Sequence, residues 1–319
     1  MTVSEPRACA ALFPGQGSQE KGMGRDLAER EPEYMDLWKR AEKASGLPLR
    51  EIYWDGEESD MARTDALQPA MTAVNLSLWM RAGARLAPAG VAGHSLGEYS
   101  ALAAAGVLSL DDTLEITALR GRLMSQAGGP DQGMTAVLKL SLAQVEEIAA
   151  AAADATGTLC IAANRNTPAQ FVLSGHKAAL EVAAERIKEA KGRAVPLAVA
   201  GAFHSPLVEE AAAELAKAMG KLDWSAPRIP VVLNVTAAPE PDPAKVKDAM
   251  TRQMVSPVRW IESMAALWGL GARRFVELGP KGVLARMCAA NVAPLGAAEG
   301  EWSAESAATL EAADTLLQA

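Results

Sequence analysis

Residues 93–97 read Gly93-His94-Ser95-Leu96-Gly97 and match G-x-S-x-G, a pattern typical of serine enzymes that form acyl intermediates. In this pattern the serine lies in a sharp turn between a strand and a helix, where neighbouring side chains have little room. The helix that follows points backbone N–H groups toward a developing oxyanion. A helix is predicted directly after this turn, from Glu98, so the pattern favours a nucleophile at Ser95 over a plain strand–helix turn.

A serine nucleophile needs a base, and the chain contains three histidines. His94 adjoins Ser95, and adjacent side chains in a sharp turn diverge, so we assign it a structural role. His176 stands at a predicted helix start and is expected to be a solvated loop residue. His204 lies in a loop between a predicted strand and helix, at the joint of two predicted domains, where an imidazole can reach across a cleft. By elimination and by context, His204 is the predicted base.

The sequence does not single out a carboxylate to orient this base. Four aspartates lie between Ser95 and His204: Asp111, Asp112, Asp131 and Asp154. The first two are better explained as helix caps, and the others lie in a loop or at a helix end. The orienting group is therefore one of these carboxylates or, instead, a backbone or amide oxygen.

A glycine-rich turn follows the first predicted strand, with the sequence Pro14-Gly15-Gln16-Gly17-Ser18-Gln19. It does not fit a dinucleotide fingerprint, because Glu20 replaces the third glycine, nor a phosphate-binding loop, because Met23 replaces the lysine. Such a turn offers backbone N–H groups, and acyl transfer needs donors of this kind from a second loop near the serine.

Around these residues, the apolar pattern predicts alternating strands and helices. A first strand over 8–13 leads to the glycine turn, and a small-residue segment over 87–92 leads to the serine turn. Helices are predicted over 25–45, 68–86, 98–107, 111–127, 206–221, 243–255 and 258–267, and strands over 229–235 and 273–278. Residues 300–319, rich in alanine and glutamate, are predicted to form a surface helix.

Between about residues 132 and 200 the predicted order of strands and helices changes to β-α-β-β-α-β. Strands are predicted over 134–140, 159–163, 170–174 and 194–199, and helices over 142–154 and 177–190. This order is that of a ferredoxin-like unit. We therefore predict a large α/β domain of residues 1–131 and 201–319, with a small inserted domain of residues 132–200.

Composition excludes several other classes of protein. The chain has 319 residues, half of them apolar and 22% charged, as in ordinary globular proteins. No run approaches the ~20 apolar residues that span a bilayer, and residues 1–7 lack a signal-peptide pattern. A net charge of −8 argues against nucleic acid. Three separated cysteines indicate neither disulfides nor a metal framework. We expect a soluble cytoplasmic protein without a membrane or metal partner.

Five motifs in the same chain resemble those of one enzyme family. They are Gly15-Gln16-Gly17-Ser18-Gln19, the segment from Gly93 to Ala101, Arg120-Gly121-Arg122-Leu123-Met124, Gly201-Ala202-Phe203-His204-Ser205 and Glu277-Leu278-Gly279-Pro280. Over about 8–290 the chain resembles the malonyl-CoA:acyl carrier protein transacylases of fatty acid synthesis and the acyltransferase domains of polyketide synthases. This resemblance implies an α/β-hydrolase-like core with a ferredoxin-like insertion.

The resemblance also implies roles for individual residues. Ser95 would be the nucleophile and His204 its base, and the backbone N–H groups of Gln16 and Leu96 would form the oxyanion hole. The main-chain carbonyl of Gln253 would hold the imidazole. The family's site-lining positions correspond to Gln68 and Asn164, and its carboxylate anchor to Arg120.

The reaction implied by the resemblance is ping-pong transfer through a malonyl-serine ester. The donor would be a CoA thioester, the acceptor an acidic acyl carrier protein, and no cofactor would be bound. Arg120 would pair with the free malonyl carboxylate through two parallel bonds. Phe203 would leave little space for a 2-methyl branch, although Gly201 departs from the histidine commoner at that position. Docking of the acidic carrier needs a local basic patch, with candidates Lys188, Lys191, Arg193, Arg273, Arg274, Lys281 and Arg286.

Other functions remain possible from the sequence. The acceptor protein could belong to a polyketide pathway, or water could be the acceptor, as in a serine thioesterase or hydrolase. A non-catalytic module that binds carrier proteins is a third alternative. A patatin-like lipase is disfavoured, because the Asp55-Gly56 pair precedes Ser95 in the chain.

Overall fold

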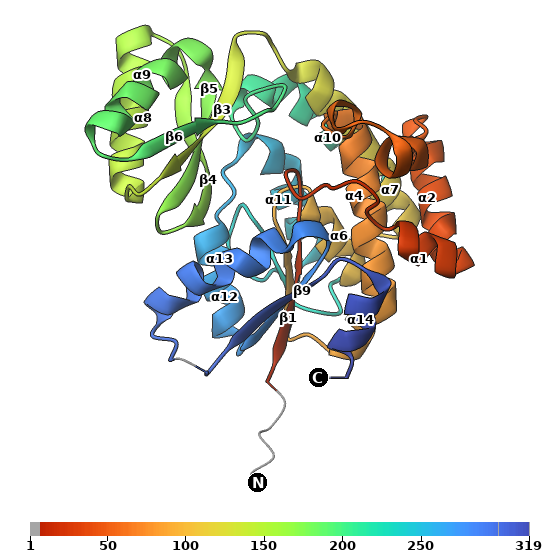
Figure 1. Ribbon diagram of the computed structural model, residues 1–319. Coiled ribbons are helices and arrows are strands. Elements are labelled where there is room, and N and C mark those ends of the chain that lie inside the picture. The colour runs from red at the N-terminus through yellow and green to blue at the C-terminus, as the bar shows by residue number, and fades with distance from the viewer. Residues whose placement is uncertain (1–6, 299, 319) are drawn as a thin grey trace.

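Five parallel strands form the central sheet of the computed structural model, which describes residues 7–298 and 300–318 (Figure 1). The strand order is β7-β2-β1-β8-β9. These strands are β1 (Cys9–Phe13), β2 (Gly90–Gly93), β7 (Val231–Val232), β8 (Arg274–Leu278) and β9 (Ser303–Ala307). Every residue of β1 and β2 is buried, as expected for a parallel sheet that is covered on both faces.

Helices and helical turns make up much of the remaining chain. The α-helices are α1 (Arg25–Arg30), α2 (Pro32–Ser45), α3 (Glu58–Met61), α4 (Thr64–Leu78), α5 (Ala84–Leu86), α6 (Gly97–Ala104), α7 (Leu110–Ala127), α8 (Leu142–Thr156), α9 (Lys177–Glu189), α10 (Glu209–Met219), α11 (Pro243–Arg252), α12 (Trp260–Gly269), α13 (Val283–Val292) and α14 (Leu310–Leu316). Two π-helical turns are η1 (Glu51–Asp55) and η2 (Trp79–Gly83). Four 3-10 turns are η3 (Pro206–Val208), η4 (Gln253–Val255), η5 (Pro280–Gly282) and η6 (Ala293–Leu295).

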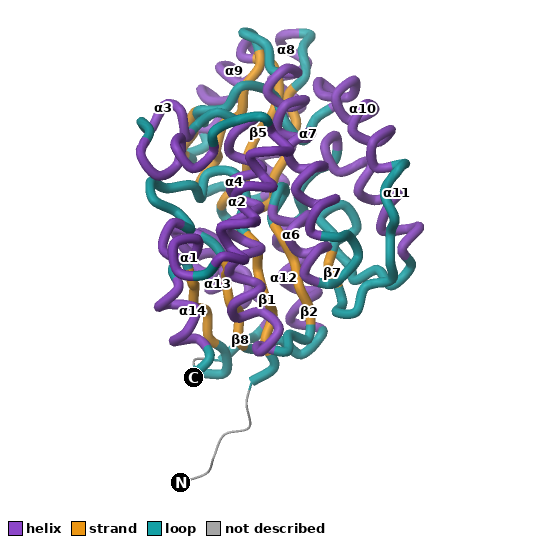
Figure 2. Tube along the Cα trace, turned by 90° about the vertical axis from the view of Figure 1, so that its right-hand side faces the viewer, coloured by secondary structure: helices purple, strands orange, loops and turns teal. Residues whose placement is uncertain are grey.

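Alternate residues of β1 face two different layers of helices. Ala10 and Leu12 belong to the core cluster that includes residues of α12 and α13. Ala11 and Phe13 belong to the cluster that includes residues of α2, α4, α6 and α7. Figure 1 shows α12 and α13 on the opposite side of β1 from α4 and α6, and Figure 2 shows α2 and α4 in front of the strands. The two-residue period of a strand therefore divides the core into two layers.

A second, antiparallel sheet has the order β4-β5-β3-β6, and all its strands fall within the predicted insertion. They are β3 (Gln132–Leu138), β4 (Cys160–Thr167), β5 (Gln170–His176) and β6 (Arg193–Pro196). Helices α8 and α9 pack on one face with Val137, Phe171 and Leu173. The alternate residues Met134 and Val172 join the main core instead. The predicted α/β fold class, with a large parallel-sheet unit and a smaller antiparallel one, is confirmed. The domain boundaries at 131 and 200 stay a prediction.

Strand β4 is hydrogen-bonded through its backbone to Val258, in the segment that precedes α12. The amide of Val258 donates to the carbonyl of Ala163 at 2.8 Å, and the amide of Arg165 donates to the carbonyl of Val258 at 2.9 Å. The side chain of Asn291 on α13 donates to the carbonyl of Asn166 at 3.0 Å. The inserted sheet is thus fixed against the segment that precedes α12.

Two predicted helices are interrupted in the structure. The segment 25–45 divides into α1 and α2 at Glu31, which is extended because the following Pro32 disfavours a helical conformation there. The segment 68–86 changes to π-helical geometry at Trp79 and continues as α5. The predicted strand over 229–235 is shortened to the two residues of β7.

The prediction of a single helix over residues 300–319 is wrong. Strand β9 lies in this segment, pairs in parallel with β8 and forms one edge of the sheet, and only α14 is helical. The small and polar residues of 303–307, Ser-Ala-Glu-Ser-Ala, gave no strand pattern. Within residues 7–298 and 300–318, no helix has the length and apolar character needed to cross a membrane.

Candidate active site

The turn at Ser95 has the backbone conformation of a nucleophile elbow. Strand β2 ends at Gly93, helix α6 begins at Gly97, and Ser95 between them has φ of +51°. A Cβ atom added to Gly93 would overlap the backbone of Gly97, and one added to Gly97 would overlap the backbone of Phe13. The two glycines are therefore required by close packing, and the uncommon φ turns Ser95 away from the strand.

The structure brings Ser95 and His204 into hydrogen-bond contact. The distance from Ser95 Oγ to His204 Nε2 is 2.7 Å, although the residues are 109 positions apart. His204 also has a positive φ, +57°, in the turn before η3, and its side chain is 4% exposed. The hydroxyl and the imidazole thus have the geometry of a nucleophile and its base.

Two backbone carbonyl groups orient this imidazole. His204 Nδ1 lies 3.1 Å from the carbonyl oxygen of Gln253 and 3.0 Å from that of Ser256. Because both oxygens can only accept, Nδ1 carries the proton and Nε2 is left to accept one from Ser95. The sequence did not indicate the Ser256 carbonyl, since a backbone acceptor leaves no trace in residue type.

The four aspartates considered as triad members have other surroundings. Asp111 forms an ion pair with Arg40 at 3.3 Å, and Asp112 accepts a hydrogen bond from Ser109. Ser109, rather than either aspartate, is the side chain that caps α7. Asp131 and Asp154 are exposed. Carbonyl oxygens therefore take the position that a carboxylate occupies in a catalytic triad.

Burial keeps the imidazole of His204 neutral. Removal from water, with smaller contributions from the positive charge of Arg120 and from His94, lowers the pKa of His204 to about 3. A neutral imidazole is the form that accepts a proton, so His204 is competent as a base throughout the neutral range.

The pH dependence of Ser95 reactivity follows from this shift. We expect labelling of Ser95 by a fluorophosphonate, a probe without a carboxylate, to show no loss centred near the ordinary histidine value of about 6.5 as the pH falls from 8 to 5. The acidic limb of the profile is displaced to lower pH, because His204 stays unprotonated until the pH approaches its lowered pKa. Labelling rates are measured by mass spectrometry and corrected for probe hydrolysis in buffer. A midpoint near 6.5 contradicts the lowered pKa of His204.

The glycine turn lies against the serine turn, as the predicted oxyanion hole requires. A Cβ added to Gly15 would overlap the carbonyl of His94 and lie 3.4 Å from the amide nitrogen of Leu96. Asn75 on α4 holds the turn by donating to the carbonyl of Pro14 at 3.0 Å. Within the part of the chain that is described, the amides of Gln16 and Leu96 have no acceptor, which leaves both N–H groups available.

Arg120 projects from α7 into the same site, where it is 1% exposed. Its Nη2 donates to Ser95 Oγ and to Gln253 Oε1, both at 3.1 Å, and its Nη1 donates to Gln68 Oε1 at 2.9 Å. All three acceptors are uncharged. A buried guanidinium whose hydrogen-bond acceptors are neutral oxygens can pair with an anionic group beside the nucleophile.

The neighbouring Gly121 explains how α7 comes so close to α4. A Cβ at Gly121 would lie 2.8 Å from the carbonyl oxygen of Thr64, at the start of α4. The glycine therefore costs helix stability but permits the close packing that places Arg120 against Gln68.

A small cavity lies at Ser95, and most of the predicted site residues line it. Its volume is about 160 Å³. It is lined by Gln16, His94, Ser95, Leu96, Arg120, Met124, Met134, Asn164, Asn166, Val172, Leu197, Val199, Phe203 and His204. Asn164 and Phe203 thus lie where the sequence placed them, whereas Gln68 lies behind Arg120 and supports it. The turns after β1 and β2, helix α7 and strands of the second sheet all contribute to its lining.

The other two histidines do not contact the hydroxyl. His94 Nε2 lies 2.8 Å from Asn166 Oδ1, and its ring packs at 5.5 Å from that of Trp260. His176 is at the start of α9, where its Nδ1 accepts from the amide of Leu159 at 3.2 Å. Both histidines have structural partners, and His94 also lines the cavity.

Two buried polar residues behind the serine turn were missed. Glu98 is fully buried, and this burial, opposed by hydrogen bonds and by Arg120, raises the pKa of its carboxyl group to about 7. Asn234 Oδ1 accepts from the amide of Ser95 at 2.8 Å, and its Nδ2 donates to the carbonyl of Gly93 at 2.7 Å. The sequence held a signal for each of them. Glu98 is a charged residue in the first turn of a buried helix, and Asn234 is an amide residue within an apolar run.

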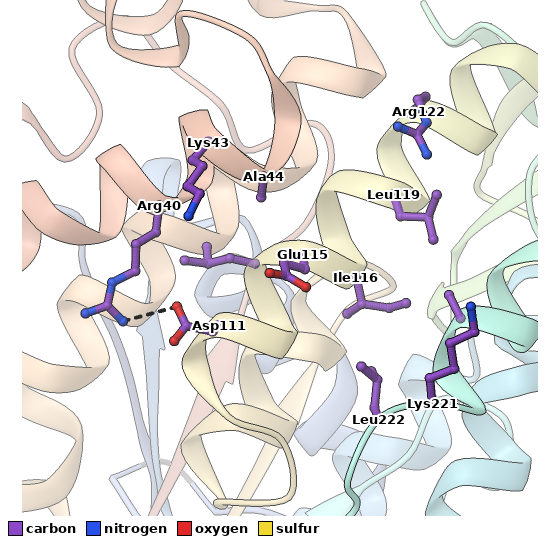
Figure 3. A pocket seen from close by; sticks show the side chains of 12 residues that line it. Arg40, Lys43, Ala44, Asp111, Glu115, Ile116, Leu119, Arg122, Lys221 and Leu222 are labelled. Atoms are coloured by element: carbon purple, nitrogen blue, oxygen red, sulfur yellow. Dashed lines mark hydrogen bonds and ion pairs between the residues drawn. The ribbon is translucent and has the colours of Figure 1, made fainter.

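A larger cavity, of about 740 Å³, lies on the outer face of α7. Figure 3 shows Arg40, Lys43 and Arg122 around it, with the dashed line joining Arg40 to Asp111. Its lining comes from α2, α7, α10 and the segment after α10, and includes no residue of the serine turn. It is therefore separate from the site at Ser95.

Comparison with known proteins agrees with this geometry. The sequence model of the acyl transferase domain family matches residues 11–314 of this chain. A malonyl CoA-acyl carrier protein transacylase from Salmonella typhimurium is 37% identical over 280 residues, which cover 86% of this chain and 90% of the relative.

Two solved structures are similar along almost their whole length. An acyl carrier protein S-malonyltransferase from Vibrio cholerae has a TM-score of 0.88 and 36% identity, covering 97% of this chain and 99% of the other. A malonyl-transacylase in complex with a type II polyketide synthase acyl carrier protein has a TM-score of 0.90 and 32% identity, covering 98% and 99% of the two chains.

Proposed function

The chain belongs to the acyl transferase domain family, and from this membership and the geometry at Ser95 we propose that it carries a malonyl group, as an ester of Ser95, from malonyl-CoA to the phosphopantetheine thiol of acyl carrier protein. The observation that carries the malonyl part is the buried guanidinium of Arg120, which has only neutral partners and lies 3.1 Å from the hydroxyl. A carboxylated acyl group on Ser95 would bring a negative charge within reach of this guanidinium.

The first half-reaction forms the ester. Ser95 Oγ attacks the thioester carbonyl carbon while its proton passes to His204 Nε2, and the amides of Gln16 and Leu96 stabilise the resulting oxyanion. The carbon–sulfur bond then breaks, and the CoA sulfur leaves as a thiol with the proton from the imidazolium. The carbonyl groups of Gln253 and Ser256 stabilise that imidazolium through Nδ1–H.

The second half-reaction reverses these steps with a different thiol. The phosphopantetheine thiol of the carrier gives its proton to His204, its sulfur attacks the ester carbonyl, and Ser95 regains the proton as it leaves. The same base and the same oxyanion donors serve both halves. This symmetry explains how one small site accepts two thiols in turn.

Arg120 provides selectivity among donors. A malonyl carboxylate can pair with the guanidinium through two parallel bonds, whereas an acetyl group leaves the cation unpaired in a dry site. A site built for a charged partner rejects an analogue that lacks it more strongly than it rejects a small change in apolar size. Phe203, which lines the cavity, adds a steric limit against a 2-methyl branch.

Two of the seven basic residues expected to dock the carrier form ion pairs within the chain. Arg273 pairs with Glu301, and Arg274 pairs with Glu305 and donates to the carbonyl of Leu316. These two arginines are therefore engaged with the C-terminal segment. The proposed patch is limited to the remaining candidates, Lys188, Lys191, Arg193, Lys281 and Arg286.

The donor is a CoA thioester, and we propose that the reaction needs no resident cofactor, because the groups described above account for each proton and bond. Location in the cytoplasm is also part of this proposal. It is supported by Cys9, Cys160 and Cys288, which are buried as free thiols, as in a reducing compartment.

Intact-protein mass spectrometry after exposure to malonyl-, methylmalonyl- and acetyl-CoA tests the proposal. We expect a malonyl adduct to form first and in highest yield, and to disappear when an acyl carrier protein with its phosphopantetheine arm is added. Rapid hydrolysis of malonyl-CoA without any thiol acceptor would instead identify a hydrolase. Supplying carriers of fatty acid and polyketide synthesis side by side identifies the acceptor pathway.

A further inference from the structure

The carboxylate of Glu98 accepts two hydrogen bonds behind the active site, and the mechanism above does not use it. Glu98 lies in the first turn of α6 and is fully buried. Its Oε1 accepts from the backbone amide of Asn234 at 2.8 Å, and its Oε2 accepts from Gln253 Nε2 at 2.8 Å. An isolated carboxylate at such depth is costly, so its position calls for a function.

Glu98, together with the carbonyl of Ser95, determines which way the amide of Gln253 points. Gln253 Nε2 also donates to the carbonyl of Ser95 at 2.8 Å, so the NH2 end faces two groups that only accept. The opposite end, Oε1, then faces Arg120 Nη2 at 3.1 Å, and a guanidinium can only donate. Every donor in this chain of contacts therefore meets an acceptor.

We propose that Glu98 is a positioning residue of the malonyl site, whose carboxylate fixes the Gln253 amide so that Gln253 Oε1 holds the Arg120 guanidinium beside Ser95. This inference rests on the proposed function, since it concerns selectivity for a carboxylated acyl group. Glu98 contacts neither the acyl group nor the reacting atoms, and it acts through Gln253.

The other oxygen of Glu98 supports the serine turn. It accepts from the backbone amide of Asn234, and the side chain of Asn234 bonds the amide of Ser95 and the carbonyl of Gly93. One carboxylate therefore connects the nucleophile, in the turn before α6, with the carboxylate anchor on α7.

Replacement of Glu98 by glutamine keeps the size of the side chain but breaks this pattern. If the new NH2 group faces Gln253, two NH2 groups oppose each other, and a reversed Gln253 amide presents its NH2 to Arg120. If the new NH2 group faces Asn234 instead, it opposes the backbone N–H there. Each arrangement places two hydrogen-bond donors against each other. Where this happens at Arg120, it impairs malonyl transfer in particular.

The experiment compares kcat and KM for malonyl- and acetyl-CoA in Glu98→Gln and wild type at pH 8, where Glu98 is ionised. We expect kcat/KM for malonyl transfer to fall about 10- to 100-fold, with a smaller change for acetyl, because malonyl loses its pairing with Arg120 whereas acetyl makes no such pair. Gln253→Met, which retains the backbone carbonyl that holds His204, should reduce the malonyl-to-acetyl ratio in the same direction.

Glu277→Gln is the matched control. Glu277 is also fully buried, its pKa is likewise raised by burial to about 7, and it accepts from the amide of Ala285 at 2.8 Å. It should alter thermal unfolding without changing the malonyl-to-acetyl ratio. An equal loss for both substrates in Glu98→Gln and Gln253→Met, or an unchanged ratio in both, overturns the inference while wild-type malonyl loading stands. A wild-type protein that forms no malonyl adduct overturns the proposed function as well.

Discussion

Replacing Ser95 by alanine is expected to abolish the malonyl adduct and to lower the transfer rate by on the order of 10⁶-fold, as removal of a serine nucleophile does in other acyl enzymes. His204 and the amides of Gln16 and Leu96 remain in this variant, but no group is left to form the ester. The adduct is measured by intact-protein mass spectrometry, and transfer by the appearance of malonyl acyl carrier protein.

Ser77→Ala provides the control for loss of a buried hydroxyl. Ser77 is fully buried in α4, where its Oγ donates to the carbonyl of Ala73 at 2.8 Å, within its own helix. This variant should still form the adduct at the wild-type rate. A malonyl adduct that persists in Ser95→Ala would show that another residue is the nucleophile.

Replacing Arg120 by alanine is expected to lower malonyl transfer by roughly 10²- to 10³-fold, because the malonyl carboxylate would be buried without its partner. Transfer of acetyl should rise relative to malonyl, since the neutral acyl group no longer leaves a cation unpaired. Competition between malonyl- and acetyl-CoA, followed by the masses of the two adducts, measures this ratio directly.

Arg122 is a matched control on the same helix. It lies two residues beyond Arg120 and lines the cavity on the outer face of α7 shown in Figure 3. Arg122→Ala should retain the wild-type malonyl-to-acetyl ratio. If Arg120→Ala also retains that ratio, the guanidinium is not the carboxylate anchor.

Most of the order of elements could be predicted from the sequence because most strands and helices carry a clear apolar period, but helices α3 and α13 were not predicted. Three predicted elements differ from the structure for local reasons. Pro32 divides one helix at Glu31, π-helical geometry interrupts another at Trp79, and β7 retains only two residues of its apolar run. Strand β9 was missed because serine, alanine and glutamate at 303–307 have little strand preference, and pairing with β8 overrides this.

For the site, reactive side chains could be predicted better than the groups that hold them. Ser95, His204 and Arg120 are unusual residues in recognisable motifs, and the structure brings all three together. The acceptors behind them are backbone oxygens and amide side chains, such as the Ser256 carbonyl and Asn234, whose roles depend on distances between remote segments. No spacing in the chain encodes those distances.

Strand β9 also bears on where a shorter version of this chain can end. The strand pairs with β8 along five residues, from Arg274 with Ser303 to Leu278 with Ala307. A chain cut near residue 290 would leave the backbone of β8 open to solvent on that side, and an exposed strand of this kind recruits other molecules into aggregates. A shorter version that keeps this edge of β8 covered therefore includes β9, well past the last catalytic motif.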